Sequence, residues 1–180
     1  MANREALRQL QLRLASRLQA ARTEGASVSS WLAVELADGN PYLIPLAHAG
    51  EIFPWSVVQA VPYTKDWFLG VANLRGGLAG VVDLARFMGA SPVRSEQAMA
   101  ETSLLALNGA LELNAALLID RLAGLRRADA FVACEPPPKS APPFFGGVYR
   151  DGDGVRWQEL NLQTLSQHPQ FLGIRASIPI

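Results

Sequence analysis

Cysteine and histidine are scarce in this chain. Of its 180 residues one is a cysteine, Cys134, and two are histidines, His48 and His168. A single cysteine excludes an internal disulfide and fits a reducing compartment, and we expect it to be a small core or loop hydrophobe rather than a nucleophile. The two histidines have no metal-ligand spacing, and neither belongs to a recognisable nucleophile motif. The sequence therefore predicts neither a metal centre nor a catalytic triad.

Net charge and long apolar runs are also absent. Sixteen basic residues balance sixteen acidic ones, which argues against a nucleic-acid binder, because phosphate neutralisation needs a strongly basic surface. The longest apolar runs, such as residues 115–119, are far too short to span a bilayer. The arginine-rich segment 1–25 has no uninterrupted apolar stretch of the kind found in signal peptides. We therefore expect a cytoplasmic protein that meets a membrane only indirectly.

The loops lack the motifs that hold phosphate or calcium. The chain has no phosphate-cradling Gly-Lys-Ser/Thr loop. The acidic turn at residues 151–154 lacks the later glutamate that a calcium loop needs, so we expect a plain hairpin turn there. The proline-rich segment 136–143 is incompatible with a central strand or a helix and predicts a solvated loop, with a polyproline ligand for a partner as the alternative. No cofactor is predicted.

The N-terminal segment 1–25 has the pattern of one amphipathic helix over residues 3–23. Its apolar side chains recur every three or four residues, at Leu7, Leu10, Leu14, Leu18 and Ala21. The residues leave three roles open: packing on the body of the protein, docking on a partner, or self-association between two copies of the chain. A membrane-surface helix is not favoured, because the apolar face has no aromatic residues.

After this helix the apolar pattern changes to period two, which is typical of strands. Short extended segments separated by turns recur from residue 31 to 84, and a similar series follows from 104 to 162. The chain therefore has the pattern of two similar all-β lobes, at about 30–100 and 101–172, followed by a tail at 173–180. Short strands with Gly-rich turns favour small closed barrels, because closure removes exposed sheet edges.

The segment 67–84 has the most distinctive pattern: a strand, a tight polar turn and a second strand. Arg75 is its only fixed charge before Asp83 and lies at the turn between two apolar runs. With no second ionisable group beside it in the sequence, this cation suits docking better than catalysis. Three interpretations stay open: Arg75 pairs internally with Glu51 or Asp83, it is exposed for a partner, or it binds an anion together with backbone N–H groups.

Other residues of this segment have structural explanations of their own. We expect Asn73 to cap its own turn, and Asp83 to shape the turn into a short helix that follows. Gly70 and Gly76 are explained most simply by a positive φ or by close approach of another backbone segment. The pattern therefore predicts a rigid hairpin that presents one cation.

The hairpin and its flanks closely resemble the signature of CheW-like domains, the coupling proteins of bacterial chemosensory arrays. The resemblance lies in Val61-Pro62-Tyr63, in the stretch from Trp67 to Gly76 with its Asn73-Leu74-Arg75-Gly76 core, and in Val81-Val82-Asp83-Leu84. It implies an all-β fold of two SH3-like five-stranded barrels packed side by side over residues 30–172, with an N-terminal α-helix. The N-terminal extension and the ending at 165–172 resemble the branch of the family that serves type IV pilus (twitching) systems.

The resemblance implies a non-enzymatic adaptor. It would couple the cytoplasmic tip of a methyl-accepting chemosensory receptor to the regulatory domain of a CheA-type histidine kinase, at membrane-associated arrays that control pilus motility. By position, the partner-binding residues that it implies are Ala49, Glu51, Gly70, Asn73, Arg75, Gly76, Asp120 and Leu122. Two alternatives stay open: an adaptor of a flagellar or other chemosensory pathway, and a small-molecule or anion-binding barrel, which could be an enzyme, that uses Arg75 as its anchor.

Overall fold

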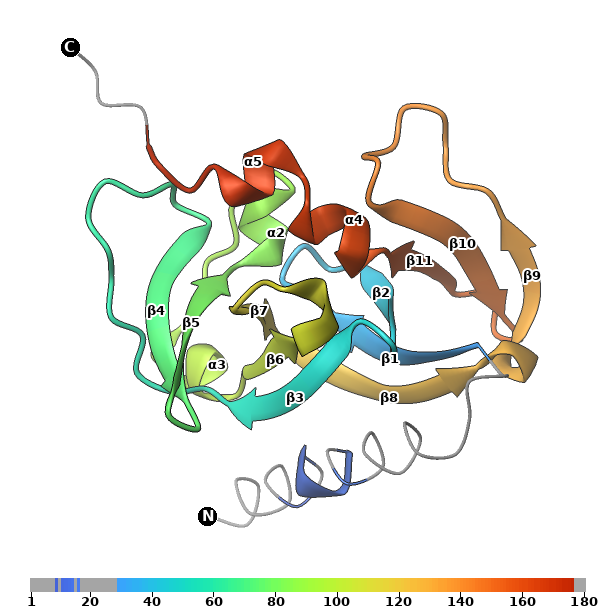
Figure 1. The fold of residues 1–180 in the computed structure, drawn as a ribbon. Helices are drawn as coiled ribbons and strands as arrows, with labels where there is room; N and C mark the ends of the chain where they lie inside the picture. Colours follow the sequence, from blue (N-terminus) through green and yellow to red (C-terminus); the bar gives the residue numbers. More distant parts are fainter. Residues whose placement is uncertain (1–8, 10, 15, 17–28, 177–180) are drawn as a thin grey trace.

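The computed structural model describes residues 9, 11–14, 16 and 29–176, which fold mainly into β-strands. The strands form two mixed sheets that pack against each other (Figure 1). The five-stranded sheet has the order β3 (Ala49–Pro54), β6 (Ser103–Leu107), β7 (Ala115–Ile119), β5 (Gly77–Val82) and β4 (Phe68–Leu74). The six-stranded sheet has the order β8 (Arg121–Arg127), β1 (Ser30–Glu35), β2 (Pro41–Pro45), β11 (Arg156–Leu160), β10 (Phe145–Asp151) and β9 (Phe131–Glu135). No helix within the described ranges is long and apolar enough to cross a membrane.

Strand pairing does not follow the order of the chain. Strands β1 and β2 pair with β8 and β11 from the second half, while β6 and β7 pair with β3 and β5 from the first half. The sheets therefore do not divide the chain near residue 100, where the sequence repeat predicts a boundary between lobes. A repeat predicts which segments form strands, but the neighbours of each strand depend on contacts between distant segments. The six-stranded sheet has one strand more than the expected five, and its first and last strands, β8 and β9, are joined by the 3-10 turn η2 (Ala128–Ala130).

Each sheet has buried side chains on both of its faces. The largest hydrophobic cluster takes side chains from both sheets, such as Leu32 from β1 and Leu117 from β7. Smaller clusters cover the opposite faces, one with Leu118 in the five-stranded sheet and one with Trp31 in the six-stranded sheet. All residues of β7 are buried, which explains why its sequence is continuously apolar instead of alternating.

Four short α-helices and one more 3-10 turn complete the described fold. They are α2 (Leu84–Phe87), α3 (Glu96–Ala100), η1 (Gly109–Leu111), α4 (Leu162–Ser166) and α5 (Pro169–Leu172). Helices α2, α4 and α5 lie together along one side of the sheets (Figure 1). The N-cap of α2 is Asp83, whose carboxylate accepts the backbone N–H of Arg86 at 3.3 Å. Asn161 has the same role at α4, so short polar side chains begin both helices where each preceding strand ends.

The N-terminal helical residues contact the body of the protein. Residues 9, 11–14 and 16 are helical, and Leu14 from the predicted apolar stripe is buried. The amide Nε2 of Gln11 donates to Oγ of Ser103 at the start of β6, at 2.9 Å. These contacts fit packing of the stripe on the body of the protein. The other residues of the helix predicted over 3–23 lie outside the described residues, and self-association through this helix stays a prediction.

The loops of the six-stranded sheet follow the expectations. Residues 136–143 form an irregular loop between β9 and β10, and the turn between β10 and β11 is a plain hairpin. The Asp151 carboxylate organises this turn by accepting the backbone N–H groups of Asp153 and Val155 and the indole N–H of Trp157. The prediction for Cys134 is wrong: this residue lies exposed on β9 rather than in the core or a loop. Cys134 lies on the same exposed face of β9 as Val132, and the sequence pattern does not reveal that this face is exposed.

Candidate functional site

The β4–β5 hairpin ends in a tight turn with Arg75 at its tip. Leu74 pairs with Gly77, and the two residues between them, Arg75 and Gly76, have φ angles of 51° and 83°. Two consecutive positive φ angles are typical of a type I′ turn, whose twist matches that of the flanking strands. Oδ1 of Asn73 accepts the backbone N–H of Gly76 at 2.7 Å, so Asn73 caps this turn. The hairpin therefore holds an arginine in a conformation that glycine or asparagine adopts more easily.

The Arg75 side chain forms an ion pair on the surface. Its Nη2 lies 2.6 Å from Oε1 of Glu51 on β3, and 76% of the arginine side chain is exposed. The ring of Phe53, also on β3, lies 6.0 Å below the guanidinium carbon. Among the alternatives that the sequence leaves open, Arg75 pairs with Glu51 and not with Asp83. Because an exposed pair contributes about 0–1 kcal/mol to stability, its effect is mainly to orient the guanidinium.

A groove of about 370 Å³ opens beside this pair. Its walls are the hairpin, the first residues of β3, the end of β6, and the loop that leads into β7. Leu78, the second residue of β5, is an exposed apolar side chain on the wall next to Arg75. Among the described residues that line the groove, only Glu51 and Arg75 are ionisable. The groove therefore offers apolar contact, the polar residues Asn108 and Asn114, and one ion pair, a composition that suits docking of another molecule.

Gly70 supports the hairpin from inside the fold. It is buried in β4 with a φ of 137°, and a Cβ atom there would lie 2.2 Å from the backbone oxygen of Gln59. The close approach lets Gln59 pair with Val71 through two backbone hydrogen bonds of 2.8 and 2.9 Å. Gly70 thus fastens the β3–β4 loop to the hairpin, and it does not line the groove.

Ala49 and Leu122 also lie away from the groove surface. Ala49 is fully buried and pairs with Leu107 across β3 and β6. Leu122 is a half-buried residue of β8 that packs against the core between the sheets. Both are well placed to support the fold, while Glu51, Asn73, Arg75 and Gly76 form the hairpin site itself.

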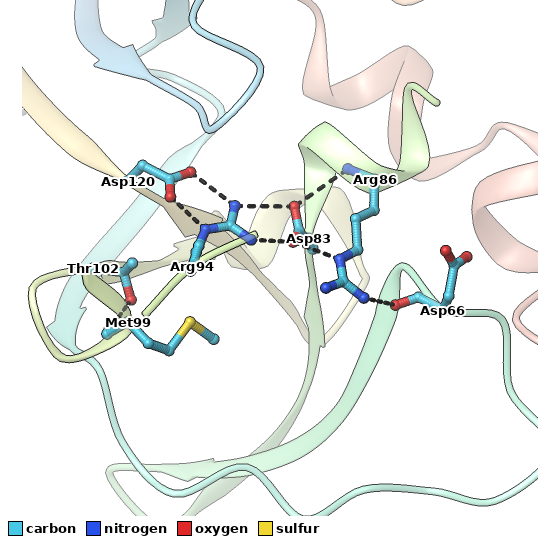
Figure 2. A network of polar contacts seen from close by, with 7 residues as sticks. All are labelled: Asp66, Asp83, Arg86, Arg94, Met99, Thr102 and Asp120. Carbon is cyan, nitrogen blue, oxygen red and sulfur yellow. Dashed lines mark hydrogen bonds and ion pairs between the residues drawn. The ribbon is translucent and has the colours of Figure 1, made fainter. Parts of the chain in front are cut away.

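Asp120 and Asp83 meet at a second place, through an arginine that the sequence reasoning missed. Arg94 lies between them with only 9% of its side chain exposed (Figure 2). Its guanidinium donates to Asp83 at 2.6 and 3.4 Å and to Asp120 at 2.5 and 2.9 Å. Arg86 adds a second cation on the other side of Asp83, at 3.3 Å. No periodicity or motif distinguishes Arg94 in the small, polar segment that carries it.

The electrostatics of this cluster favour the charged form of Arg94. Burial alone would lower the pKa of Arg94, but the bonds to Asp120 and Asp83 outweigh burial and raise the pKa above its ordinary value. The side chain of Asp83 is 1% exposed, so its charge depends on the two arginines for compensation. Arg94 and Asp83 thus form a nearly buried ion pair, while Asp120 and Arg86 beside them are 21% and 36% exposed.

Metal binding finds no support among the described residues. They contain no group of three or more histidine, cysteine, aspartate or glutamate side chains arranged to hold a metal ion. Burial lowers the pKa of His48, which lies in the turn between β2 and β3. His168 precedes α5 and packs edge-on against the rings of Phe87 and Phe144. The two histidines therefore occupy separate structural positions.

Comparison with known proteins shows similarity in both sequence and fold. The model of the CheW-like domain family matches residues 30–170. Protein PilI of Pseudomonas aeruginosa is 29% identical over 154 residues, which are 82% of this chain and 82% of that protein. The crystal structure of the scaffolding protein TtCheW from Thermoanaerobacter tengcongensis superposes with a TM-score of 0.65 at 19% identity, over 79% of this chain and 95% of the other. The sequence and the fold thus point to the same group of proteins.

Proposed function

Because the chain belongs to the CheW-like domain family, whose members are scaffold proteins rather than enzymes, we propose that it is a non-enzymatic adaptor of a chemosensory system. In this proposal it joins the cytoplasmic tip of a methyl-accepting receptor to the regulatory domain of a CheA-type histidine kinase. It acts in the cytoplasm and reaches the membrane only through the receptor. The adaptor holds its two partners in a fixed relative geometry, so that the state of one biases the state of the other.

One observation carries the proposal: the exposed Arg75–Glu51 pair beside a groove with both apolar and polar walls. The tight turn limits the backbone freedom of Arg75, so little backbone conformational entropy is lost at this residue when a partner binds. Glu51 occupies one side of the guanidinium, and most of the side chain still faces solvent. An arginine beside an exposed leucine is a typical binding hot spot, because its planar fork combines hydrogen bonds with apolar contact. We assign the receptor tip to this groove.

The type IV pilus is the proposed pathway. The support is the similarity to PilI over most of both chains, together with the N-terminal extension before β1. A flagellar or other chemosensory pathway is the alternative within the same class. Expression of the chain in strains that lack the pilus adaptor or the flagellar adaptor distinguishes them, since we expect it to restore twitching and not swimming.

An anion-binding barrel is less well supported by the geometry. Glu51 lies 2.6 Å from Arg75 and neutralises the charge that would attract an anion. A thermal-shift screen against nucleotides and phosphorylated metabolites tests this alternative. Stabilisation by one of them that Arg75→Ala abolishes would favour the barrel over the adaptor.

The adaptor proposal is tested by binding measurements with the full chain. The partners are a helical-hairpin fragment of a receptor tip and a CheA-type regulatory domain, titrated separately in a calorimeter. We expect Arg75→Glu to raise the Kd for the receptor fragment about tenfold or more, because it replaces the attracting cation and repels Glu51.

Arg156→Glu is the matched control. Arg156 is a similarly exposed arginine (65%) that pairs with Glu135 in the other sheet. We expect its reversal to leave the Kd for the receptor fragment unchanged. A wild-type chain that binds neither partner, or equal losses in the two variants, would contradict the proposal.

A further inference from the structure

The chain passes from one sheet to the other twice: over residues 46–48 between β2 and β3, and at the single residue Asp120 between β7 and β8. Strand β7 of the five-stranded sheet ends at Ile119, and β8 of the six-stranded sheet begins at Arg121. The backbone N–H of Asp120 donates to the oxygen of Glu35 at the end of β1, at 3.2 Å, and Arg121 forms an ion pair with the Glu35 side chain. The geometry of this crossing therefore influences how the two sheets are oriented.

Strand β5 connects the docking hairpin to the same place. It starts next to the Arg75 turn and ends directly before Asp83, so it spans roughly 20 Å at the usual rise per residue. It also lies parallel to β7, with Val82 opposite Leu117. The carboxyl ends of these neighbouring strands bring Asp83 and Asp120 to one edge of the sheet, where Arg94 bonds to both (Figure 2).

Arg94 is suited to fix this junction. A guanidinium has five donors in a rigid plane, and here it makes two bonds to each carboxylate, which sets the direction of both strand ends. A buried ion pair adds little net stability compared with apolar packing, because desolvation offsets most of the attraction. Its directional bonds can instead select one arrangement of the elements that it joins. The apolar core between the sheets resists separation, while Arg94 supplies direction.

We propose that Arg94 is the positioning residue of the adaptor: by tying Asp83 at the end of β5 to Asp120 at the sheet crossing, it fixes the relative orientation of the two sheets. This inference rests on the proposed adaptor function. A partner in the groove contacts the hairpin that leads into β5. A shift of β5 that this contact causes then reaches the six-stranded sheet through the bonds of Arg94 to Asp83 and Asp120. Asp120 in this scheme serves partner binding indirectly, through Arg94.

The first test measures orientation and needs no partner. Spin labels are attached to Leu78→Cys on β5 and Val132→Cys on β9, both exposed positions in different sheets, in a Cys134→Ser background. Pulsed electron paramagnetic resonance then measures the distribution of distances between the two spin labels, one in each sheet. We expect Arg94→Lys to broaden it, because lysine is a single point charge that cannot hold two carboxylates in one plane.

The second test measures coupling in the full chain. The coupling factor is the ratio of the Kd values for the kinase domain without and with the receptor fragment. In Arg94→Lys we expect each separate Kd to stay within about twofold and the coupling factor to fall about fivefold or more, within the usual range of such factors. Asp120→Asn, which keeps the side-chain size, serves as the second variant if Arg94→Lys does not fold. Arg156→Lys is the control and leaves both readouts unchanged.

The outcomes separate this inference from the adaptor proposal. A narrow distance distribution with unchanged coupling in folded variants overturns the positioning role of Arg94 and leaves the adaptor standing. If the Kd for each separate partner rises by as large a factor as the coupling factor falls, the positioning role is also overturned, since Arg94 is then a purely structural residue. A wild type that binds both partners without coupling overturns it too. Absence of binding by the wild type defeats the adaptor proposal itself.

Discussion

Substitution of Arg75 by glycine and by alanine separates its role in docking from its role in stability. The φ angle of 51° places Arg75 in the left-handed region, which side chains with a Cβ atom adopt at a cost. Alanine retains a Cβ atom and therefore this cost, whereas glycine removes it. Both substitutions remove the guanidinium and its ion pair with Glu51. The two variants thus differ mainly in backbone strain.

The difference in unfolding free energy follows from three terms. Loss of the exposed ion pair costs about 0–1 kcal/mol in both variants. The left-handed conformation costs roughly 1–2 kcal/mol for alanine and nothing for glycine. Glycine gives back about 0.4–1 kcal/mol because its unfolded chain has more conformational entropy. We therefore expect Arg75→Gly to be more stable than Arg75→Ala by about 1 kcal/mol, although both lose binding of the receptor fragment equally.

Urea unfolding followed by tryptophan fluorescence measures this difference. With a slope of about 1–3 kcal/mol per molar urea, 1 kcal/mol separates the two midpoints by roughly 0.3–1 M. Equal midpoints, or a lower midpoint for Arg75→Gly, would refute the argument that Arg75 is held in a strained turn. Retention of receptor binding by Arg75→Gly would refute the argument that its guanidinium is the docking group.

Two further predictions concern Gly70 and Asp151. Gly70 has a φ of 137°, and a backbone oxygen lies 2.2 Å from the place that its Cβ atom would occupy, so we expect Gly70→Ala to lower the free energy of unfolding by about 2–4 kcal/mol in urea. Gly152 faces open space, and we expect Gly152→Ala to change it by no more than about 0.5 kcal/mol. Similar urea midpoints for the two variants would contradict this account. The indole N–H of Trp157 leads the interactions that lower the pKa of Asp151 from 3.8, so its contribution is present above the unfolded pKa and is lost as the pH falls through the lower folded pKa. We therefore expect the urea midpoint of Asp151→Asn to fall less steeply than that of the wild type as the pH drops below about 4. The same dependence of the midpoint on pH in both proteins would contradict this expectation.

The hairpin is an element that local sequence predicts well. Its two apolar runs, its Gly-rich turn and the Asn73 cap all act within a few residues of one another, and the structure has the turn where the pattern indicates. The pairing of Arg75 with Glu51 was one of several open alternatives, because the two residues lie on strands whose relative placement depends on the rest of the sheet. Local chemistry thus predicts the cation, and the fold selects its partner.

The division of the chain into sheets could not be predicted in the same way. Period-two patterns identify segments such as β1 and β6 as strands, but they carry no information about which strand lies next to which. The parallel pairings of β2 with β11 and of β5 with β7 join segments from different halves of the chain. Ala49 and Leu122 show the effect on the predicted site: both match the family's partner-binding residues by position, but in the fold Ala49 is buried and Leu122 packs against the core.

The amino-acid sequence by itself determined the all-β class, the rigid hairpin with its single cation, and the resemblance to CheW-like domains, because each depends on residues close together in the chain. The tertiary structure alone decided that Arg94 joins Asp83 and Asp120. These three residues lie on separate segments, and they meet only because β5 and β7 run side by side in one sheet. A buried cation needs compensating carboxylates nearby, and only the folded chain supplies them.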